Sequence, residues 1–131
     1  MLVVDASAAI EILIETEVGA RWRDRIVRPE ASLCAPNLID IEVLSGLRRL
    51  ASVRMSLAAR TERAAADFAD LRITRYGHVA LLPRIWELRK AISAYDASYV
   101  ALAETLDVPL LTCDAKLSRS HGHRAKIELL T

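Results

Sequence analysis

Acidic residues that could bind a cation are spread along the chain, and two of them directly follow short apolar runs. Leu2 to Val4 read as a buried strand that ends at Asp5, and Asp114 comes just after a second such strand, Pro109 to Thr112. A buried carboxylate is stable only when it is paired, hydrogen-bonded or bound to metal. Because ligands bind at the carboxyl ends of strands in open parallel sheets, both acids are candidates for one site. Each could also be an ordinary loop acid or a helix cap.

Two further acids lie in predicted helices. Glu42 falls between Leu38 and Ile39 on a helical wheel, inside an apolar stripe, where a carboxylate must be neutralised, salt-bridged or coordinated. An arginine partner is therefore an alternative to a cation for Glu42. Asp96 stands three residues after Ser93, which is the spacing of a capping box. Capping a helix and binding a cation are compatible roles for Asp96.

Four carboxylates would meet in one pocket if these segments converge: Asp5, Glu42, Asp96 and Asp114. Two carboxylates about 4 Å apart repel by roughly 4 kcal/mol at an effective dielectric constant of about 20. Mg²⁺ or Mn²⁺ relieves this repulsion, and a site without His or Cys favours these ions over zinc. Such a cation activates water for hydrolysis of a phosphodiester. The hydroxyls of Ser7 and Thr112 stand near two of the acids and could orient water or phosphate, with helix capping as the alternative for Ser7.

Short apolar strands separated by helices are expected to position these acids. The predicted strands are residues 2–5, 32–35, 72–76, 109–112 and 126–130, and the predicted helices are 6–15, 18–28, 37–51, 56–71, 78–91 and 93–106, with a helical turn at 115–120. Asn37, Ser56 and Ser93 are the expected caps of three of these helices. The alternation is typical of a parallel sheet covered by helices on both faces, an α/β fold.

The length and composition favour one domain spanning residues 1–131. No apolar stretch is long enough for a membrane span, and Asp5, Glu11 and Glu15 interrupt the start that a secretory signal would need. We therefore expect a cytoplasmic protein without a membrane partner. The net charge of +1 does not by itself predict nucleic-acid binding, but gathering four acids in a pocket would leave an excess of basic charge elsewhere.

Other motifs exclude several classes of protein. Cys34 and Cys113 lie far apart without CxxC spacing, so we interpret them as small buried hydrophobic residues rather than as a zinc site or a disulfide. The glycines form no GxGxxG or P-loop pattern, and the GxSxG elbow of serine hydrolases is absent. Trp22 and Trp86 occupy apolar helical positions and are expected in the core, although an exposed one could instead stack on a base.

The segments around the four acids resemble the PIN-domain family, and specifically the VapC-type toxins of bacterial toxin-antitoxin pairs. The matching segments are VVDASA at residues 3–8, IDIEVLSGL around Glu42, SAYDASYVALAE around Asp96 and PLLTCDAKL around Asp114. They occur in the order of the family, and the general likeness covers nearly the whole chain. The resemblance implies a PIN-like, three-layer α/β/α sandwich with a central, mainly parallel sheet.

The resemblance also implies an activity and partners. Asp5, Glu42, Asp96 and Asp114 would be the catalytic, metal-binding acids of a Mg²⁺- or Mn²⁺-dependent endoribonuclease, with Asp114 the least direct ligand. The protein would form a homodimer and be held inactive by a VapB-like antitoxin. Arg48, Arg49 and Arg54 would face either RNA phosphates or solvent.

Two alternatives remain open at this level. A PIN-like module that binds RNA or protein without cutting would tolerate the loss of the pocket acids, whereas this chain keeps all four. A phosphatase with an aspartyl nucleophile usually has a second acid two residues beyond the first, and here that position is Ser7.

Overall fold

Five short strands form one sheet at the centre of the protein, as a computed structural model of residues 1–131 shows. In chain order they are β1 (Leu2–Val4), β2 (Leu33–Pro36), β3 (Ile73–Tyr76), β4 (Leu110–Thr112) and β5 (Ile127–Leu129). In space the order is β3-β2-β1-β4-β5, and every neighbouring pair is parallel. The carboxyl ends of all five strands therefore lie at one edge of the sheet, and β1 lies in the middle.

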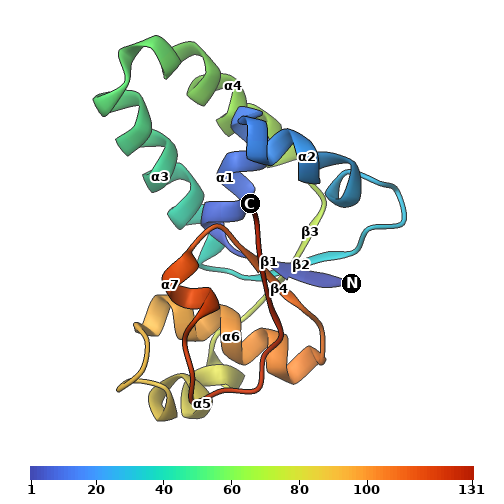
Figure 1. The fold of residues 1–131 in the computed structure, drawn as a ribbon, viewed down its shortest axis with the longest axis vertical. Helices are drawn as coiled ribbons and strands as arrows, with labels where there is room; N and C mark the ends of the chain where they lie inside the picture. The colour runs from blue at the N-terminus through green and yellow to red at the C-terminus, as the bar shows by residue number, and fades with distance from the viewer.

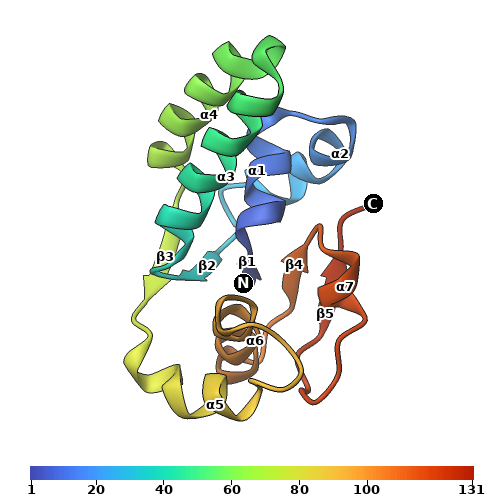
Figure 2. The same ribbon diagram turned by 90° about the vertical axis from the view of Figure 1, so that its left-hand side faces the viewer.

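Helices cover both faces of this sheet (Figure 2). One face carries α1 (Ala6–Ile14), α2 (Glu17–Ile26), α3 (Ile39–Val53) and α4 (Ala58–Asp70), and the other carries α5 (Leu82–Glu87) and α6 (Ala94–Leu106). The short α7 (Ala115–Ser118) packs beside β4 and β5. Two 3-10 turns, Met55–Leu57 and Val79–Leu81, precede α4 and α5. The predicted three-layer α/β/α sandwich is confirmed, and α3 and α4 form a hairpin that extends beyond the sheet (Figure 1).

The helix α6 is the most deeply buried helix of the fold. Every residue from Ala97 to Ala103 is buried, because α6 packs under β1, β2 and β4 at the centre of the sheet. The small side chains of Ala97, Ala101 and Ala103 allow this close approach. Ser93 caps α6 as predicted, since its Oγ accepts a 3.1 Å hydrogen bond from the backbone N–H of Asp96. The first turn of α6, with Asp96, is thereby fixed in position.

Two of the predicted helix caps are wrong. Asn37 does not cap α3, which begins at Ile39 after Leu38 and has no side-chain cap. Instead the backbone N–H of Leu38 donates a 3.1 Å hydrogen bond to Nε2 of His78, a residue 40 positions away. Ser56 lies inside a 3-10 turn, and α4 begins two residues later without a side-chain cap. At α3 a distant residue thus satisfies the backbone, while at α4 the preceding 3-10 turn does so, because the backbone N–H of Ala58 donates to the carbonyl oxygen of Met55.

The structure tests the predicted burial of the two tryptophans and the two cysteines. Trp86 is 68% exposed, so its assignment to the core is wrong, while Trp22 is partly buried against the core. The helix predicted over residues 78–91 is instead a 3-10 turn followed by the six residues of α5, and Val79 and Leu82 in this segment are exposed as well. Cys34 is buried as predicted, whereas Cys113 is only partly buried. No helix has the length and apolar character needed to cross a membrane.

Candidate active site

The four acids singled out in the sequence line one pocket of about 540 Å³: Asp5, Glu42, Asp96 and Asp114. They come from four separate elements. Asp5 follows β1, Asp114 follows β4, Glu42 lies on α3 and Asp96 in the first turn of α6. We call this hollow the acidic pocket. No ion pair of the structure includes any of these four carboxylates, so the arginine partner considered for Glu42 is absent.

Asp5 is the most buried of the four acids, with 6% of its surface exposed. It caps α1, because Oδ1 accepts hydrogen bonds from the backbone N–H of Ala8 at 2.9 Å and from Oγ of Ser7 at 2.7 Å. Its Oδ2 accepts a hydrogen bond from Oγ1 of Thr112 at 2.5 Å. Burial raises the pKa of Asp5 above its usual value, these hydrogen bonds partly oppose that shift, and the charge of Asp96 adds to it.

The hydroxyls of Ser7 and Thr112 connect Asp5 to the loop after β4. Oγ of Ser7 accepts a 3.0 Å hydrogen bond from the backbone N–H of Cys113, and Oγ1 of Thr112 accepts one of 3.0 Å from the backbone N–H of Asp114. Each hydroxyl thus donates to Asp5 and accepts from that loop. The two hydroxyls therefore hold the Asp5 carboxylate in position. Asp5, rather than Ser7, is the cap of α1.

Glu42 has one hydrogen-bond partner, which sequence reasoning did not identify. The hydroxyl of Tyr99 donates to Oε1 of Glu42 at 2.7 Å, and Tyr99 is only 2% exposed. Burial raises the pKa of Glu42, and the hydrogen bond from Tyr99 lowers it in part. The negative charges of Asp96 and Asp5 raise this pKa further. A sequence signal for Tyr99 exists, because it stands three residues after Asp96 on the same helix face and carries a hydroxyl in a mostly apolar run.

The carboxylates of Asp96 and Asp114 are close enough in the pocket for their negative charges to interact. Burial raises the pKa of Asp96, the negative charge of Asp114 raises it further, and Ser93 opposes the shift. Asp114 caps α7, with Oδ1 accepting from the backbone N–H groups of Lys116 at 2.7 Å and Leu117 at 3.3 Å. Helix capping and a position in the pocket therefore coexist at both strand-end acids.

The donor set of the pocket fits a hard divalent cation. All four candidate ligands are carboxylates, and oxygen ligands are what Mg²⁺ and Mn²⁺ prefer. Oε2 of Glu42 and Oδ2 of Asp114 accept no hydrogen bond from the protein, so both are free to coordinate. No three acidic, histidine or cysteine side chains already surround a common point closely enough to hold an ion. Because Mg²⁺ keeps several waters and needs few direct carboxylate ligands, the pocket does not require such a preformed cage.

Comparisons with a family model, with known sequences and with solved structures each found similar proteins. Residues 2–121 match the family model described as PIN domain. The chain is 48% identical over 118 residues to the VapC ribonuclease Mb0985 of Mycobacterium bovis, covering 90% of this chain and 89% of that protein. It is 40% identical over 131 residues to ribonuclease VapC12 of Mycobacterium tuberculosis, with 99% of both chains covered. The fold is similar to that of VapBC2 from Rickettsia felis, which was solved bound to a DNA fragment from its promoter. The TM-score is 0.67 and the identity 12%, and the similarity covers 99% of this chain and 98% of the other.

Proposed function

This chain belongs to the PIN-domain family, and we propose that it is an endoribonuclease, the toxin of a VapBC-type toxin-antitoxin pair. The acidic pocket is the site at which RNA phosphodiesters are hydrolysed. The observation that carries the proposal is the convergence of four acids, distant in sequence, on one pocket without a cationic side chain bound to any of them.

In this proposal each acid of the pocket has a role. Asp5 and Asp96 are the principal ligands of Mg²⁺ or Mn²⁺, and Glu42 and Asp114 complete the negative charge and order water. When bound, the cation supplies a water of lowered pKa and stabilises the charge that develops on the phosphate. Burial and mutual repulsion raise the pKa values of Asp5, Glu42 and Asp96, so the metal-free pocket stores electrostatic repulsion that a cation relieves.

Neighbouring residues hold these acids in place. Ser7 and Thr112 keep the Asp5 carboxylate in one orientation, and Tyr99 fixes Oε1 of Glu42 while leaving Oε2 free. Preorganised ligands of this kind need little rearrangement when a cation and a phosphate arrive. A non-cleaving binding module would gain nothing from buried acids that repel one another, which is why we favour the enzyme over that alternative.

The same proposal assigns the partners. The relatives in Mycobacterium carry the name VapC, and a VapB-like antitoxin is accordingly the partner that we expect to hold this chain inactive. The homodimer and the cytoplasmic location expected from the sequence are part of the proposal, since the RNA of the producing cell is the substrate. Val79, Leu82 and Trp86, which are exposed around α5, are apolar residues available for contact with another chain.

The test is cleavage of RNA by the purified chain. Total cellular RNA is incubated with the protein, with and without Mg²⁺ or Mn²⁺, and new 5′ ends are mapped. Asp5→Asn and Asp96→Asn should abolish metal-dependent cleavage while the circular dichroism spectrum stays unchanged. Asp24→Asn, an exposed acid on α2 outside the pocket, is the matched control and should cleave like the wild type. Cleavage retained by both pocket variants, or RNA binding without any new 5′ end, would overturn the proposal.

A further inference from the structure

A second hollow of about 620 Å³ adjoins the acidic pocket. It lies between α1, α3 and the start of α4, and four residues line both hollows: Ser7, Ile10, Gly46 and Arg49. At this boundary α3 lies very close to α1, since a Cβ atom at Gly46 would come within 2.4 Å of Cδ1 of Ile10. The two hollows therefore meet at a shared edge, so a polymer bound in one can extend into the other.

The second hollow is lined by more positive than negative charge. We call it the arginine groove, after Arg49, Arg54 and Arg60, and Glu11 is the one acid that lines it. Its apolar lining includes Ile10, Leu50, Val53 and Leu57. The combination of guanidinium groups with apolar side chains matches a nucleotide, which presents both a phosphate and the face of a base.

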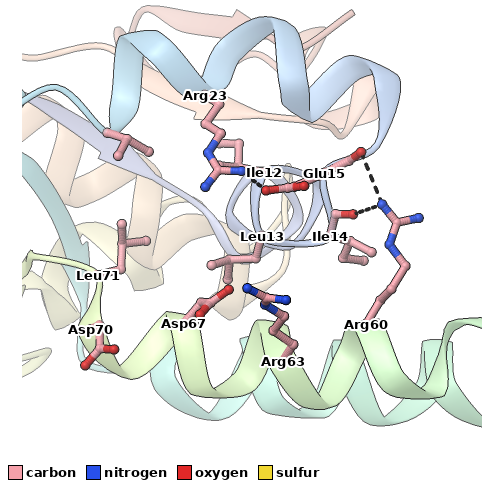
Figure 3. A pocket seen from close by; sticks show the side chains of 11 residues that line it. Ile12, Leu13, Ile14, Glu15, Arg23, Arg60, Arg63, Asp67, Asp70 and Leu71 are labelled. Carbon is pink, nitrogen blue, oxygen red and sulfur yellow. Dashed lines mark hydrogen bonds and ion pairs between the residues drawn. The ribbon is translucent and has the colours of Figure 1, made fainter.

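Two of these arginines are free to bind a ligand, while the third has a structural role. Arg60 spans from α4 to the end of α1, where its guanidinium donates to the carbonyl oxygen of Ile14 at 2.6 Å and to that of Glu15 at 3.5 Å (Figure 3). Arg49 and Arg54 are exposed and take part in no ion pair. Nothing in the fold uses their guanidinium groups.

A different hollow, drawn in Figure 3, shows that such an excess of arginine is not general. It lies between α1, α2 and α4, and its charged lining is balanced: Glu15, Asp67 and Asp70 against Arg23, Arg60 and Arg63. Arg23 is ion-paired with Glu15 there. None of its lining residues lines the acidic pocket. The unbalanced arginines occur in the hollow that adjoins the acids.

Residues of the acidic pocket and of the arginine groove follow one another along one face of α3. Glu42, Gly46, Arg49 and Val53 fall on one face of the helix, and Arg49 stands about 10 Å along the axis from Glu42 at 1.5 Å per residue. Arg48 points from another side of the same helix and lines neither hollow. An adjacent arginine outside the groove thus offers a matched control.

We propose that the arginine groove binds the RNA strand next to the scissile phosphate, with Arg49 and Arg54 contacting backbone phosphates and the apolar lining receiving a base. The inference rests on the proposed function of the acidic pocket and names how its substrate is held. Guanidinium groups bind phosphate through two hydrogen bonds in a fixed geometry, and a base packs on apolar or aromatic side chains without sequence preference.

Binding of a labelled single-stranded RNA oligonucleotide tests the groove. Fluorescence anisotropy in EDTA, where cleavage cannot occur, is measured over a series of salt concentrations for the wild type and for three variants: Arg49→Ala with Arg54→Ala, Arg49→Lys with Arg54→Lys, and Arg48→Ala. We expect the double alanine variant to bind at least roughly tenfold more weakly, the size of effect typical for hydrogen bonds to charged groups. Its slope of log K against log salt should fall by about 0.7 for each lost phosphate contact.

The controls separate the groove from the pocket. Arg48→Ala should keep the affinity and the slope of the wild type, and the double lysine variant should keep the slope because the charges remain. Because Arg48→Ala removes one charge and the double alanine variant removes two, a decrease in log K for Arg48→Ala that is half that of the double variant or more would assign the effect to net charge and overturn the groove. Unchanged binding in the double alanine variant would overturn it as well. Cleavage in Mg²⁺ by the wild type but not by Asp96→Asn reports separately on the proposed function, so the two failures are distinguishable.

Discussion

The hydroxyl of Tyr99 donates a 2.7 Å hydrogen bond to Oε1 of Glu42, although the two residues are 57 positions apart in the chain. Both flank the pocket in which the four acids meet. Tyr99 is almost completely buried, and its pKa is raised by burial, by the hydrogen bond to Glu42 and by the charge of Glu42. The pair links α6 to α3 at the edge of the pocket and decides which oxygen of Glu42 stays free.

Tyr99→Phe is expected to leave the Glu42 carboxylate less firmly held without creating a cavity in the core. The ring still fills its space, but the carboxylate loses its one hydrogen-bond donor, an interaction of about 1.5–3 kcal/mol when one partner is charged. We expect kcat/KM for RNA cleavage to fall roughly tenfold and the affinity for Mn²⁺, measured by calorimetry, to weaken. Tyr76→Phe, on β3 and outside the pocket, should change neither quantity. Wild-type affinity for Mn²⁺ in Tyr99→Phe would contradict this role.

Thr112 is expected to matter through its hydroxyl rather than its shape. This side chain is fully buried, donates to Asp5 and accepts from the backbone N–H of Asp114. Thr112→Val keeps the volume but leaves the partly buried backbone N–H of Asp114 unpaired, at a cost of about 1–3 kcal/mol in the free energy of unfolding. Thr112→Ser keeps both hydrogen bonds and should retain cleavage. Urea unfolding and cleavage rates of the two variants check this, and equal behaviour of serine and valine would contradict it.

The stability of the metal-free protein should depend on pH with a definite sign. Asp5, Glu42 and Asp96 have pKa values raised above the usual values of 3.8 for Asp and 4.5 for Glu, so the folded state binds protons more tightly than the unfolded state. The free energy of unfolding in EDTA should therefore rise as the pH falls from neutral through the raised pKa values. This gain is complete below the unfolded values.

Glu104 contributes with the opposite sign. Arg84 lowers the pKa of this carboxyl through hydrogen bonds at 2.8 and 3.0 Å, so its stabilisation is present above 4.5 and is lost as the pH falls further through the lowered pKa. Between neutral pH and about 4.5 the effect of the pocket is therefore not offset by Glu104. Urea unfolding in EDTA should show a smaller pH dependence in Asp96→Asn than in Asp24→Asn. Identical pH profiles would show that the pocket carboxylates do not repel one another, which would contradict the proposed cation site.

Gly19 is expected to be indispensable for the packing of α2 on α1. A Cβ atom at this position would lie 1.9 Å from the backbone oxygen of Glu11, which cannot move aside as a flexible side chain can. Gly19→Ala should lower the free energy of unfolding by about 1–3 kcal/mol or more, as overpacking does. Gly77→Ala is the matched control, since nothing lies within 4 Å of its Cβ position, and it should be neutral or slightly stabilising. Thermal unfolding of the two variants decides the matter.

The sequence predicted the fold class well because the signals involved are local. Short apolar runs between helical segments marked all five strands, and their ends agree with the structure to within a residue or two. The caps at Asn37 and Ser56 were wrong, because a polar residue near a helix start is only one of several ways to satisfy the backbone. Trp86 was wrong because a helical pattern shows which residues share a face, but not whether another element covers that face.

The acids of the pocket could be selected from the sequence because each is a local anomaly. A carboxylate at the end of an apolar strand, or inside an apolar stripe, costs free energy wherever the chain folds, and this cost is visible without coordinates. Their partners are a different matter. Thr112 and Asp5 are 107 residues apart and Tyr99 and Glu42 57, so no pattern within a segment reports these hydrogen bonds.

The amino-acid sequence by itself determined the strands, the class of fold and the four acids, since hydrophobic burial and the cost of burying charge act on each segment separately. Only the tertiary structure decided that Tyr99 holds Glu42, that Ser7 and Thr112 hold Asp5, and that Arg49 lies where the acidic pocket meets the arginine groove. The physical reason is that the order of strands in the sheet and the packing of α6 beneath it bring distant segments together, and those placements depend on the whole core at once.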